Sequence, residues 1–445
     1  MPLYFIDILS LLVIFAGYRH MGAMFRRHKK IFIVTILFML SLLPTTFAEY
    51  FRMGFAEPTY LLGRAFLHVI AMWPLAGLLR NPAYLKRFLM GIAGGCLVTA
   101  TVATLNSLPV TGPWVRAHIF TIDILFPKFQ RFMGDSELMM IFDEGLSTRG
   151  NALIGKSNVV GGVLIVMLPF IVGMLANVRL NPLLRTFFNI ATVIIIISLL
   201  STYSRLTYLA MAATFLGYFL YDRKEFSRRF LPVMSILVAG ILFVGIQSTF
   251  FKFEFLIDKF DLTNERYQGT NMARLYSYTR PLRLVMSDPS YIFRGAGIAH
   301  RKLREDQSDA NILVLTEGET HSVFGASIFK RGLISMILLF YLCFLLIKQT
   351  YRSMRYAKRQ RLSSEWMISA GFISFMGLAG PWLLEKFFVD KPSGHMFLFM
   401  YFALIIACID SIKSAAKENI TPEVTHGKTG KVGGVLQYRF KAPPR

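Results

Sequence analysis

Charged residues are scarce in this chain, and their scarcity argues against a soluble domain. Asp, Glu, Lys and Arg make up 17% of its 445 residues, whereas soluble domains usually carry about 25%. Hydrophobic residues account for 54%, aromatic residues account for 14%, and the mean hydropathy is +0.50. The sequence therefore indicates an integral membrane protein.

Several kinds of site that leave a signature in sequence are also absent. The three cysteines, Cys96, Cys343 and Cys408, all lie inside apolar segments, so we expect no disulfide framework. The chain has no Cys/His metal cluster, no P-loop and no dinucleotide-binding glycine fingerprint. We therefore expect no metal and no cofactor. Nucleic acid is not an expected partner either, because no basic face is interleaved with a reading motif.

What the chain does have is a series of long apolar segments. Two of them, 186–204 and 230–251, carry no charge over about the 20 residues that a membrane-spanning helix needs. Runs of this length without alternation favour helices over the strands of a barrel. The sequence predicts an all-α, polytopic transmembrane bundle of about eleven or twelve spans. The segments that we identify lie near 2–18, 31–48, 59–79, 87–105, 157–176, 186–203, 206–221, 230–251, 321–347, 366–385 and 394–412.

The basic residues are distributed unevenly between the connections. The formal net charge is +23, and alternate connections hold most of the excess. These basic stretches are 19–30, 85–87, 179–185, 222–229, 348–361 and the tail after Lys413. The positive-inside rule places them in the cytoplasm and the amino terminus outside. The first apolar segment has no basic start and no small-residue cleavage site, so we interpret it as a helix rather than a signal peptide.

Two long connections fall on the opposite, extracytoplasmic side, at 106–156 and 251–320. The second is nearly balanced in charge and too long for a simple tether, which makes it a functional candidate. We expect one transmembrane domain over 1–412 that includes both loops. The remaining segment, 413–445, is expected to be a basic, disordered cytoplasmic tail.

Several cations face this outer side in the predicted topology. The spacing of the apolar residues after Arg274 predicts an amphipathic helix that ends before Pro289, and both Arg274 and Arg280 can project from it. Arg205 lies in a short turn between two apolar segments. A single interfacial arginine is often only an anchor. The shared face is what makes these arginines candidates for a site.

Four short patterns then follow one another along the chain. They are GKSN at 155–158, TYSR at 202–205, an arginine series from Arg274 to GAG at 295–297, and HS at 321–322 followed by Gly332. In type, order and topology, these patterns resemble those of the bacterial O-antigen ligase and O-antigen polymerase superfamily of polytopic membrane glycosyltransferases. The resemblance spans about half of the chain.

The chain departs from the family pattern at three positions. Tyr278 stands where tryptophan is usual, Ser322 where asparagine is commonest, and Ser335 where glycine is frequent. None of these differences removes a titrating or cationic group, so the implied chemistry is retained. Our count of helices is about one short of the family's usual twelve.

The resemblance implies transfer of a glycan from undecaprenyl diphosphate to a sugar acceptor at the periplasmic face of a bacterial inner membrane. Arg205 and Arg274 suit a clamp on the diphosphate, because guanidinium is always charged and binds phosphate oxygens in pairs. His321 suits the general base for the acceptor hydroxyl. Direct displacement would invert the anomeric centre. No cluster of carboxylates suits a divalent cation, so we expect metal-independent chemistry.

Further residues are expected to bind substrate around these three: Arg280, Tyr278, Glu317, Glu319 and Asn158. Either glutamate could orient the imidazole of His321 or bind acceptor hydroxyls. Arg149, Lys156 and Arg294 could join the diphosphate site, and the sequence does not rank them.

Three functions remain open at this point. As a ligase, which the His-Ser pattern slightly favours, the protein would use lipid A-core as acceptor; as a polymerase it would use a second lipid-linked glycan. The rival from another class is a transporter or flippase of lipid-linked sugars. It predicts inverted repeats, of which we find none, together with broken helices and charges inside the membrane. Arg64 and His68, within the third apolar segment, favour this rival.

Overall fold

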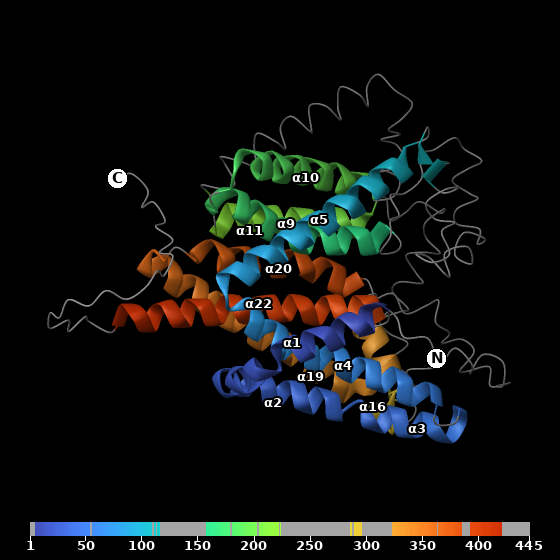
Figure 1. The fold of residues 1–445 in the computed structure, drawn as a ribbon. Helices are drawn as coiled ribbons and strands as arrows, with labels where there is room; N and C mark the ends of the chain where they lie inside the picture. The colour runs from blue at the N-terminus through green and yellow to red at the C-terminus, as the bar shows by residue number, and fades with distance from the viewer. Residues whose placement is uncertain are drawn as a thin grey trace.

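The computed structural model describes most of the predicted helices and parts of their connections (Figure 1). The described residues are 5–53, 56–108, 111–112, 114–115, 157–178, 180–202, 204–221, 223, 285–286, 289–295, 323–362, 364–384 and 392–420.

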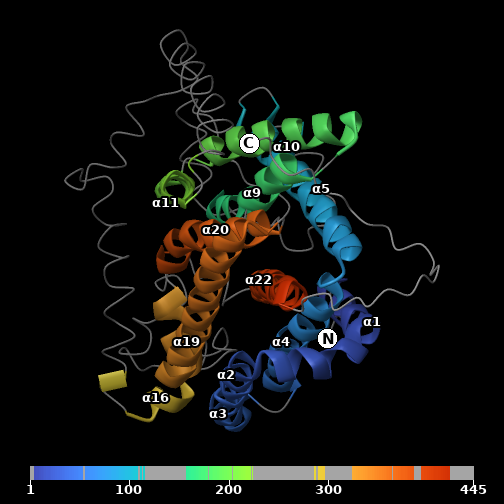
Figure 2. The ribbon, with the colours of Figure 1, turned by 90° about the vertical axis from the view of Figure 1, so that its left-hand side faces the viewer.

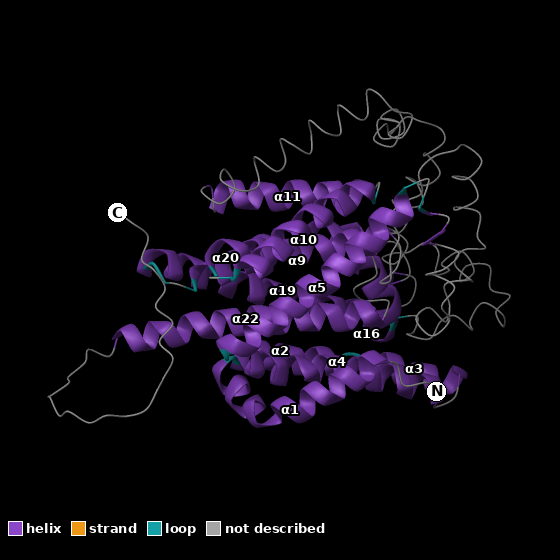
Figure 3. Cartoon of the chain, turned by 45° about the horizontal axis from the view of Figure 1, so that its top comes forward, coloured by secondary structure: helices purple, strands orange, loops and turns teal. Residues whose placement is uncertain are grey.

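Within these residues the chain is helical and contains no strand (Figure 3). The helices of the first half are α1 (Phe5–Arg27), α2 (Lys29–Leu40), α3 (Leu43–Met53), α4 (Ala56–Leu79) and α5 (Pro82–Ser107). The second half contributes α9 (Ser157–Asn177), α10 (Pro182–Ser201), α11 (Arg205–Tyr221), α16 (Tyr291–Arg294), α19 (Val323–Gln360), α20 (Glu365–Leu384) and α22 (Pro392–Ile420).

The length and composition of these helices confirm a multi-pass membrane protein. Seven stretches of the described residues are long and apolar enough to cross a bilayer. They are Asp7–Arg27, Lys29–Ala48, Pro58–Leu79, Pro82–Ser107, Pro182–Ser201, Lys330–Gln360 and Gly394–Ser414. Three shorter apolar helices lie at Val159–Leu175, Leu206–Tyr221 and Glu365–Leu378. Each matches a predicted span, and the predicted span 230–251 lies outside the described residues.

Contacts between small and large residues fix the directions of the first helices. Gly17 packs on Pro74 and His20 packs on Gly77, so α1 and α4 run in the same direction. α22 runs in this direction as well, because His395 near its start lies beside His68 of α4 and Asp410 further along pairs with Arg80 just after the end of α4.

Contacts between side chains also fix the directions of helices in the second half of the chain. Gly161 packs on Thr207, and the Tyr218 hydroxyl donates to the Pro169 carbonyl, so α9 and α11 are parallel. α19 joins them in the same sense, since Lys358 near its end donates to the carbonyl of Tyr221 at the end of α11.

The bundle consequently has two distinct ends (Figures 1 and 3). Helices α1, α4, α9, α11, α19 and α22 all begin at the end that also carries α16, which we term the α16 end. The α1–α2 and α4–α5 turns lie at the opposite, basic end, which the positive-inside rule predicts to be cytoplasmic. Seen along the helices, α22 lies between a group containing α1, α2 and α4 and a group containing α9, α10, α11 and α20 (Figure 2).

Three helix boundaries differ from the sequence-based expectation. The basic stretch 348–361 was expected to be a loop, but α19 continues through it to Gln360. α22 likewise continues to Ile420, so the start of the predicted tail, 413–445, is helical. The predicted span 31–48 is interrupted at Ser41, where α2 ends and a turn leads into α3. The positive-inside rule concerns the side on which charge lies, and it does not distinguish a loop from a helix that extends beyond the membrane.

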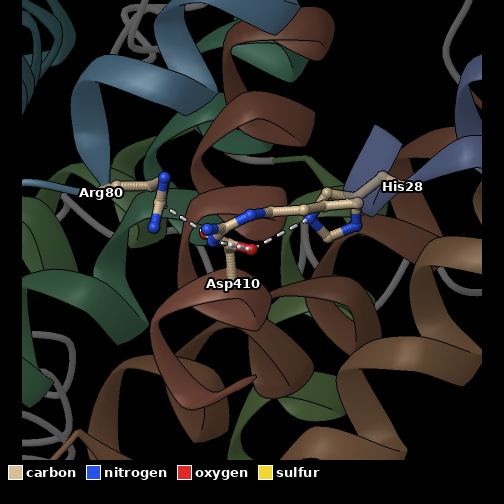
Figure 4. A network of polar contacts seen from close by, with 4 residues as sticks. His28, Arg80 and Asp410 are labelled. Atoms are coloured by element: carbon tan, nitrogen blue, oxygen red, sulfur yellow. Dashed lines mark hydrogen bonds and ion pairs between the residues drawn. The ribbon is translucent and has the colours of Figure 1, made fainter. Parts of the chain in front are cut away.

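A cluster of charges holds the basic end together (Figure 4). The carboxylate of Asp410, on α22, accepts from Arg27 Nη1 at 2.9 Å and pairs with Arg80 Nε. His28 Nε2 lies 3.6 Å from the other carboxylate oxygen. Asp410 and His28 are buried, whereas Arg27 and Arg80 are partly exposed. One carboxylate thereby joins the α1–α2 turn, the α4–α5 turn and α22.

Replacing Asp410 with asparagine is expected to destabilise the bundle clearly. The change leaves the buried His28 and two arginines around a neutral amide, and breaking a buried ion pair costs up to about 3–5 kcal/mol, less where the partners are exposed. The measurement is the thermal unfolding midpoint of the purified protein in detergent. Arg87→Gln, an exposed change on α5, is the control. Equal midpoints for Asp410→Asn and wild type would contradict a stabilising role.

Candidate functional site

Two of the patterns found in sequence meet at the α16 end. Gly295 follows α16 with a φ of +58°, and Gly332 interrupts α19 with a φ of +84°. A Cβ on Gly332 would lie 2.6 Å from the Ile292 carbonyl oxygen, and a Cβ on Gly295 would lie 2.7 Å from the Arg331 amide nitrogen. Both positions require glycine, because side chains are strained at these φ values and no space is left. Gly295, from the arginine series, and Gly332, from the His-Ser pattern, therefore each pack against the backbone around the other.

The other two patterns also meet, between α9 and α11. Gly161 of α9 lies directly against Thr207 of α11, so that a Cβ there would overlap the threonine side chain. Asn158 lies in the first turn of α9, one turn before this contact, and Arg205 is the first residue of α11. Asn158 and Arg205, the last residues of the GKSN and TYSR patterns, therefore lie at the starts of two neighbouring helices at the α16 end.

The predicted site residues themselves are largely outside the described residues. These are His321, Arg274, Arg280, Tyr278, Glu317 and Glu319. Only the backbone of Arg205 and Asn158 is described. His321 precedes the start of α19 by two positions. Its assignment as a base, and that of Arg205 and Arg274 as a clamp, stay predictions.

Beneath the α16 end lies a group of ionisable side chains that sequence reasoning did not assemble. Asp7 of α1 accepts a hydrogen bond from Arg64 Nε at 3.0 Å, and His68 Nε2 lies 3.3 Å from the same carboxylate oxygen. All three side chains are buried. The guanidinium of Arg64 also lies over the ring of Tyr60, with 5.2 Å between Cζ and the ring centroid.

Two further helices extend this group. The ring of His395, on α22, lies 6.0 Å from that of His68 and packs edge-on against Phe399. Arg331, on α19, is buried and acts electrostatically on His395. Its guanidinium lies 5.9 Å from the ring centroid of Phe38. We refer to Asp7, Arg64, His68, Arg331 and His395 as the buried polar cluster.

Sequence analysis noticed Arg64 and His68 but not their partners. Asp7, Arg331 and His395 come from three other helices, and nothing in the local sequence indicates that they converge. The usable signal was that Asp7 and His395 lie close to the outer ends of the predicted spans 2–18 and 394–412, whereas Arg331 lies further inside the span 321–347. An ionisable residue inside a membrane segment is a functional candidate by default.

The α2–α3 turn supports α19 beside this cluster. Ser41 Oγ lies 3.1 Å from Ser335 Oγ, and Thr45 Oγ1 donates to the Arg331 carbonyl at 3.4 Å. Ser335 is buried in this contact. Among the described residues, no group of His, Cys, Asp and Glu could hold a metal ion.

We expect Gly332→Ala to lower the stability of the protein by disturbing the packing between α16 and α19. An alanine there meets the Ile292 and Phe293 carbonyl oxygens, at 2.6 and 2.8 Å, in addition to the strained φ, and each effect costs about 1–3 kcal/mol. The measurement is thermal unfolding in detergent. Gly22→Ala is the matched control, since a Cβ at Gly22 meets nothing within 4 Å. Equal stability of the two variants would show that Gly332 is not tightly packed against the Ile292 and Phe293 carbonyl oxygens.

Comparison with known proteins adds no assignment. No protein-family model matches this chain, and no curated protein matches it. What the protein does must therefore be inferred from its own residues and their arrangement.

Proposed function

We propose that this protein is a membrane glycosyltransferase of the O-antigen ligase type. It transfers a glycan from undecaprenyl diphosphate to lipid A-core on the periplasmic face of a bacterial inner membrane. The observation that supports the proposal best is a pair of close contacts at or next to the sequence patterns, at one end of the bundle. Gly161 packs on Thr207, and Gly295 packs against the Arg331–Gly332 backbone. These two contacts lie at the α16 end, and the positive-inside rule predicts this end to be extracytoplasmic.

The reaction that these residues suit is a direct displacement at the anomeric carbon. The acceptor hydroxyl oxygen attacks that carbon, and the bond from the carbon to the diphosphate oxygen breaks. His321 takes the hydroxyl proton, while undecaprenyl diphosphate leaves with the electron pair. Arg205 and Arg274 stabilise the negative charge that grows on the leaving group, which is the effect that usually contributes most to catalysis. The product has the opposite anomeric configuration.

The surrounding residues are proposed to position the substrates. Arg280 and Asn158 extend the donor site, Tyr278 offers an aromatic face to a sugar, and Glu317 or Glu319 binds acceptor hydroxyls or orients His321. No metal is assigned a role, because arginine supplies the positive charge that a divalent cation would otherwise provide.

The acceptor can be identified with a purified system. Wild-type protein in detergent is given a diphosphate-linked glycan donor with either lipid A-core or a second lipid-linked glycan, and no divalent metal is added. Transfer to lipid A-core supports the ligase. Transfer only to the second glycan supports a polymerase of O-antigen or exopolysaccharide. A product that retains the donor's anomeric configuration would contradict direct displacement.

A second candidate, a transporter or flippase of the same lipid-linked sugar, is favoured by a specific observation. Asp7, Arg64 and His68 form a buried network inside membrane-spanning helices, and α19 is interrupted at Gly332. Both features occur in transporters. Within this network, Asp7 and Arg64 lie in the halves of α1 and α4 nearer the α16 end, whereas His68 lies at the middle of the span Pro58–Leu79.

A further inference from the structure

One face of α19 is exposed along its length, and the character of this face changes near the basic end. Tyr341 and Phe344 are exposed apolar side chains on this face. Four exposed cations continue it at the spacing of three and four residues that keeps side chains on one side of a helix. We term them the basic stripe: Lys348, Arg352, Arg355 and Arg359.

The opposite face of the same segment packs into the bundle. Thr350, Met354 and Ala357 are all buried. This part of α19 is therefore held against its neighbours almost to its last turn, although it continues past the apolar segment. Because the inner face is fixed by packing, the basic stripe faces away from the bundle.

The basic stripe crosses the level at which the neighbouring helix α11 ends. The ring of Tyr351 lies 6.5 Å from that of Tyr221, and Lys358 donates to the Tyr221 carbonyl. Tyr221 is the last residue of the apolar helix Leu206–Tyr221. The stripe extends about 16 Å along the helix axis, whereas the headgroup region of a bilayer is about 5–8 Å thick on each side. It therefore covers the depth at which lipid headgroups lie.

The cations of the stripe have no carboxylate partner among the described residues. α19 contains no acidic residue, and the ion pairs between described residues do not involve the stripe. Lys348 Nζ instead lies 5.5 Å from the ring centroid of Phe344, and Arg355 Cζ lies 5.8 Å from that of Tyr351. Both contacts direct the cation back along α19, toward the apolar segment. This direction favours an anion at the membrane surface over a soluble partner.

We propose that the basic stripe binds the headgroups of anionic glycerophospholipids in the leaflet at the basic end. The positive-inside rule predicts this leaflet to be the cytoplasmic one. Clusters of Lys and Arg beside a membrane-spanning segment are attracted to anionic lipids over about a Debye length. The stripe lies at the opposite end of the bundle from the proposed transfer reaction, and its ligand is neither donor nor acceptor. The proposal therefore does not rest on the proposed function.

The test is lipid binding to the delipidated, full-length protein, measured by native mass spectrometry. The ligands are phosphatidylglycerol, which is anionic, and phosphatidylethanolamine, which carries a phosphate but no net charge. A soluble poly-glutamate peptide represents an acidic protein partner. The central variant is the double substitution Arg352→Gln and Arg355→Gln. Its matched control is Lys29→Gln with Lys30→Gln, which removes two exposed positive charges at the same end of the bundle.

We expect wild type to bind phosphatidylglycerol more tightly than phosphatidylethanolamine. Each cation removed from the stripe should weaken binding of phosphatidylglycerol about fivefold, so the double variant should lose about 25-fold. Higher salt should weaken wild-type binding, because the attraction is screened. The control should bind as wild type does. Both double variants should keep the wild-type unfolding midpoint, since exposed side chains contribute little to stability.

A variant that keeps the charge separates attraction from packing. Arg352→Lys with Arg355→Lys should retain most of the binding, because lysine carries the same charge without the planar fork. Equal binding of the two lipids by wild type would overturn the proposal, as would wild-type affinity of the glutamine variant. An equal loss in the control would also overturn it, since the attraction would then come from the net charge of the whole end. Binding of poly-glutamate without binding of phosphatidylglycerol would assign the stripe to an acidic protein instead.

Discussion

Replacing His321 with alanine is expected to reduce glycan transfer about 10²–10⁴-fold, the usual contribution of a general base. The acceptor hydroxyl would then have to lose its proton to water, which is poorly placed and poorly basic at neutral pH. The measurement is the initial rate of donor-to-acceptor transfer by purified protein, with no divalent metal added.

Two controls separate chemistry from folding in this experiment. His20→Ala removes an exposed histidine near the basic end and should transfer at the wild-type rate. The unfolding midpoint of His321→Ala should match that of wild type, because a catalytic base contributes little to stability. Full activity of a folded His321→Ala protein would remove this residue from the mechanism.

Replacing either proposed clamp arginine, Arg205 or Arg274, should reduce the rate of glycan transfer almost as much as replacing His321. Removing one group that stabilises charge in a transition state typically costs about 10²–10³-fold in rate, so we expect this from Arg274→Ala and from Arg205→Ala. Lysine at either position should restore only part of the rate, since it carries the charge without the planar fork. The readout is kcat/KM with a diphosphate-linked donor.

The double variant gives the sharper result. If Arg205 and Arg274 hold the same diphosphate, their effects should not add, and the double variant should lose less than the product of the two single losses. Arg87→Ala, on the exposed surface of α5, is the control. Strict additivity would indicate that the two arginines act at separate places.

The transmembrane helices could be predicted because the signal for them is local. An apolar run of about 20 residues leaves a chain in a membrane few alternatives to a helix. The starts of α9 at Ser157 and of α11 at Arg205 fall within a residue of the predicted starts. The predicted ends of helices that extend beyond the membrane were less accurate. The basic residues up to Gln360, for example, are equally compatible with a loop and a helix.

The buried polar cluster could not be predicted because it depends on packing. Asp7 and His395 each stand alone in an apolar segment, and Arg331 has only Lys330 beside it. Only the parallel arrangement of α1, α4, α19 and α22 brings the three residues together. The contact between the segments around Gly295 and Gly332 could be predicted only in part. Both glycines belong to sequence patterns, but the sequence did not indicate that each packs against the backbone around the other.

The most direct test of the proposed function distinguishes transfer from transport in one experiment. Wild-type protein is reconstituted in sealed vesicles that contain a labelled diphosphate-linked glycan, with acceptor supplied on the side of the α16 end. We measure glycan joined to acceptor and, separately, donor that has crossed the membrane. Formation of glycan–acceptor product with release of undecaprenyl diphosphate, and no crossing, is the predicted result. Crossing of intact donor without any product would contradict the glycosyltransferase and support a transporter.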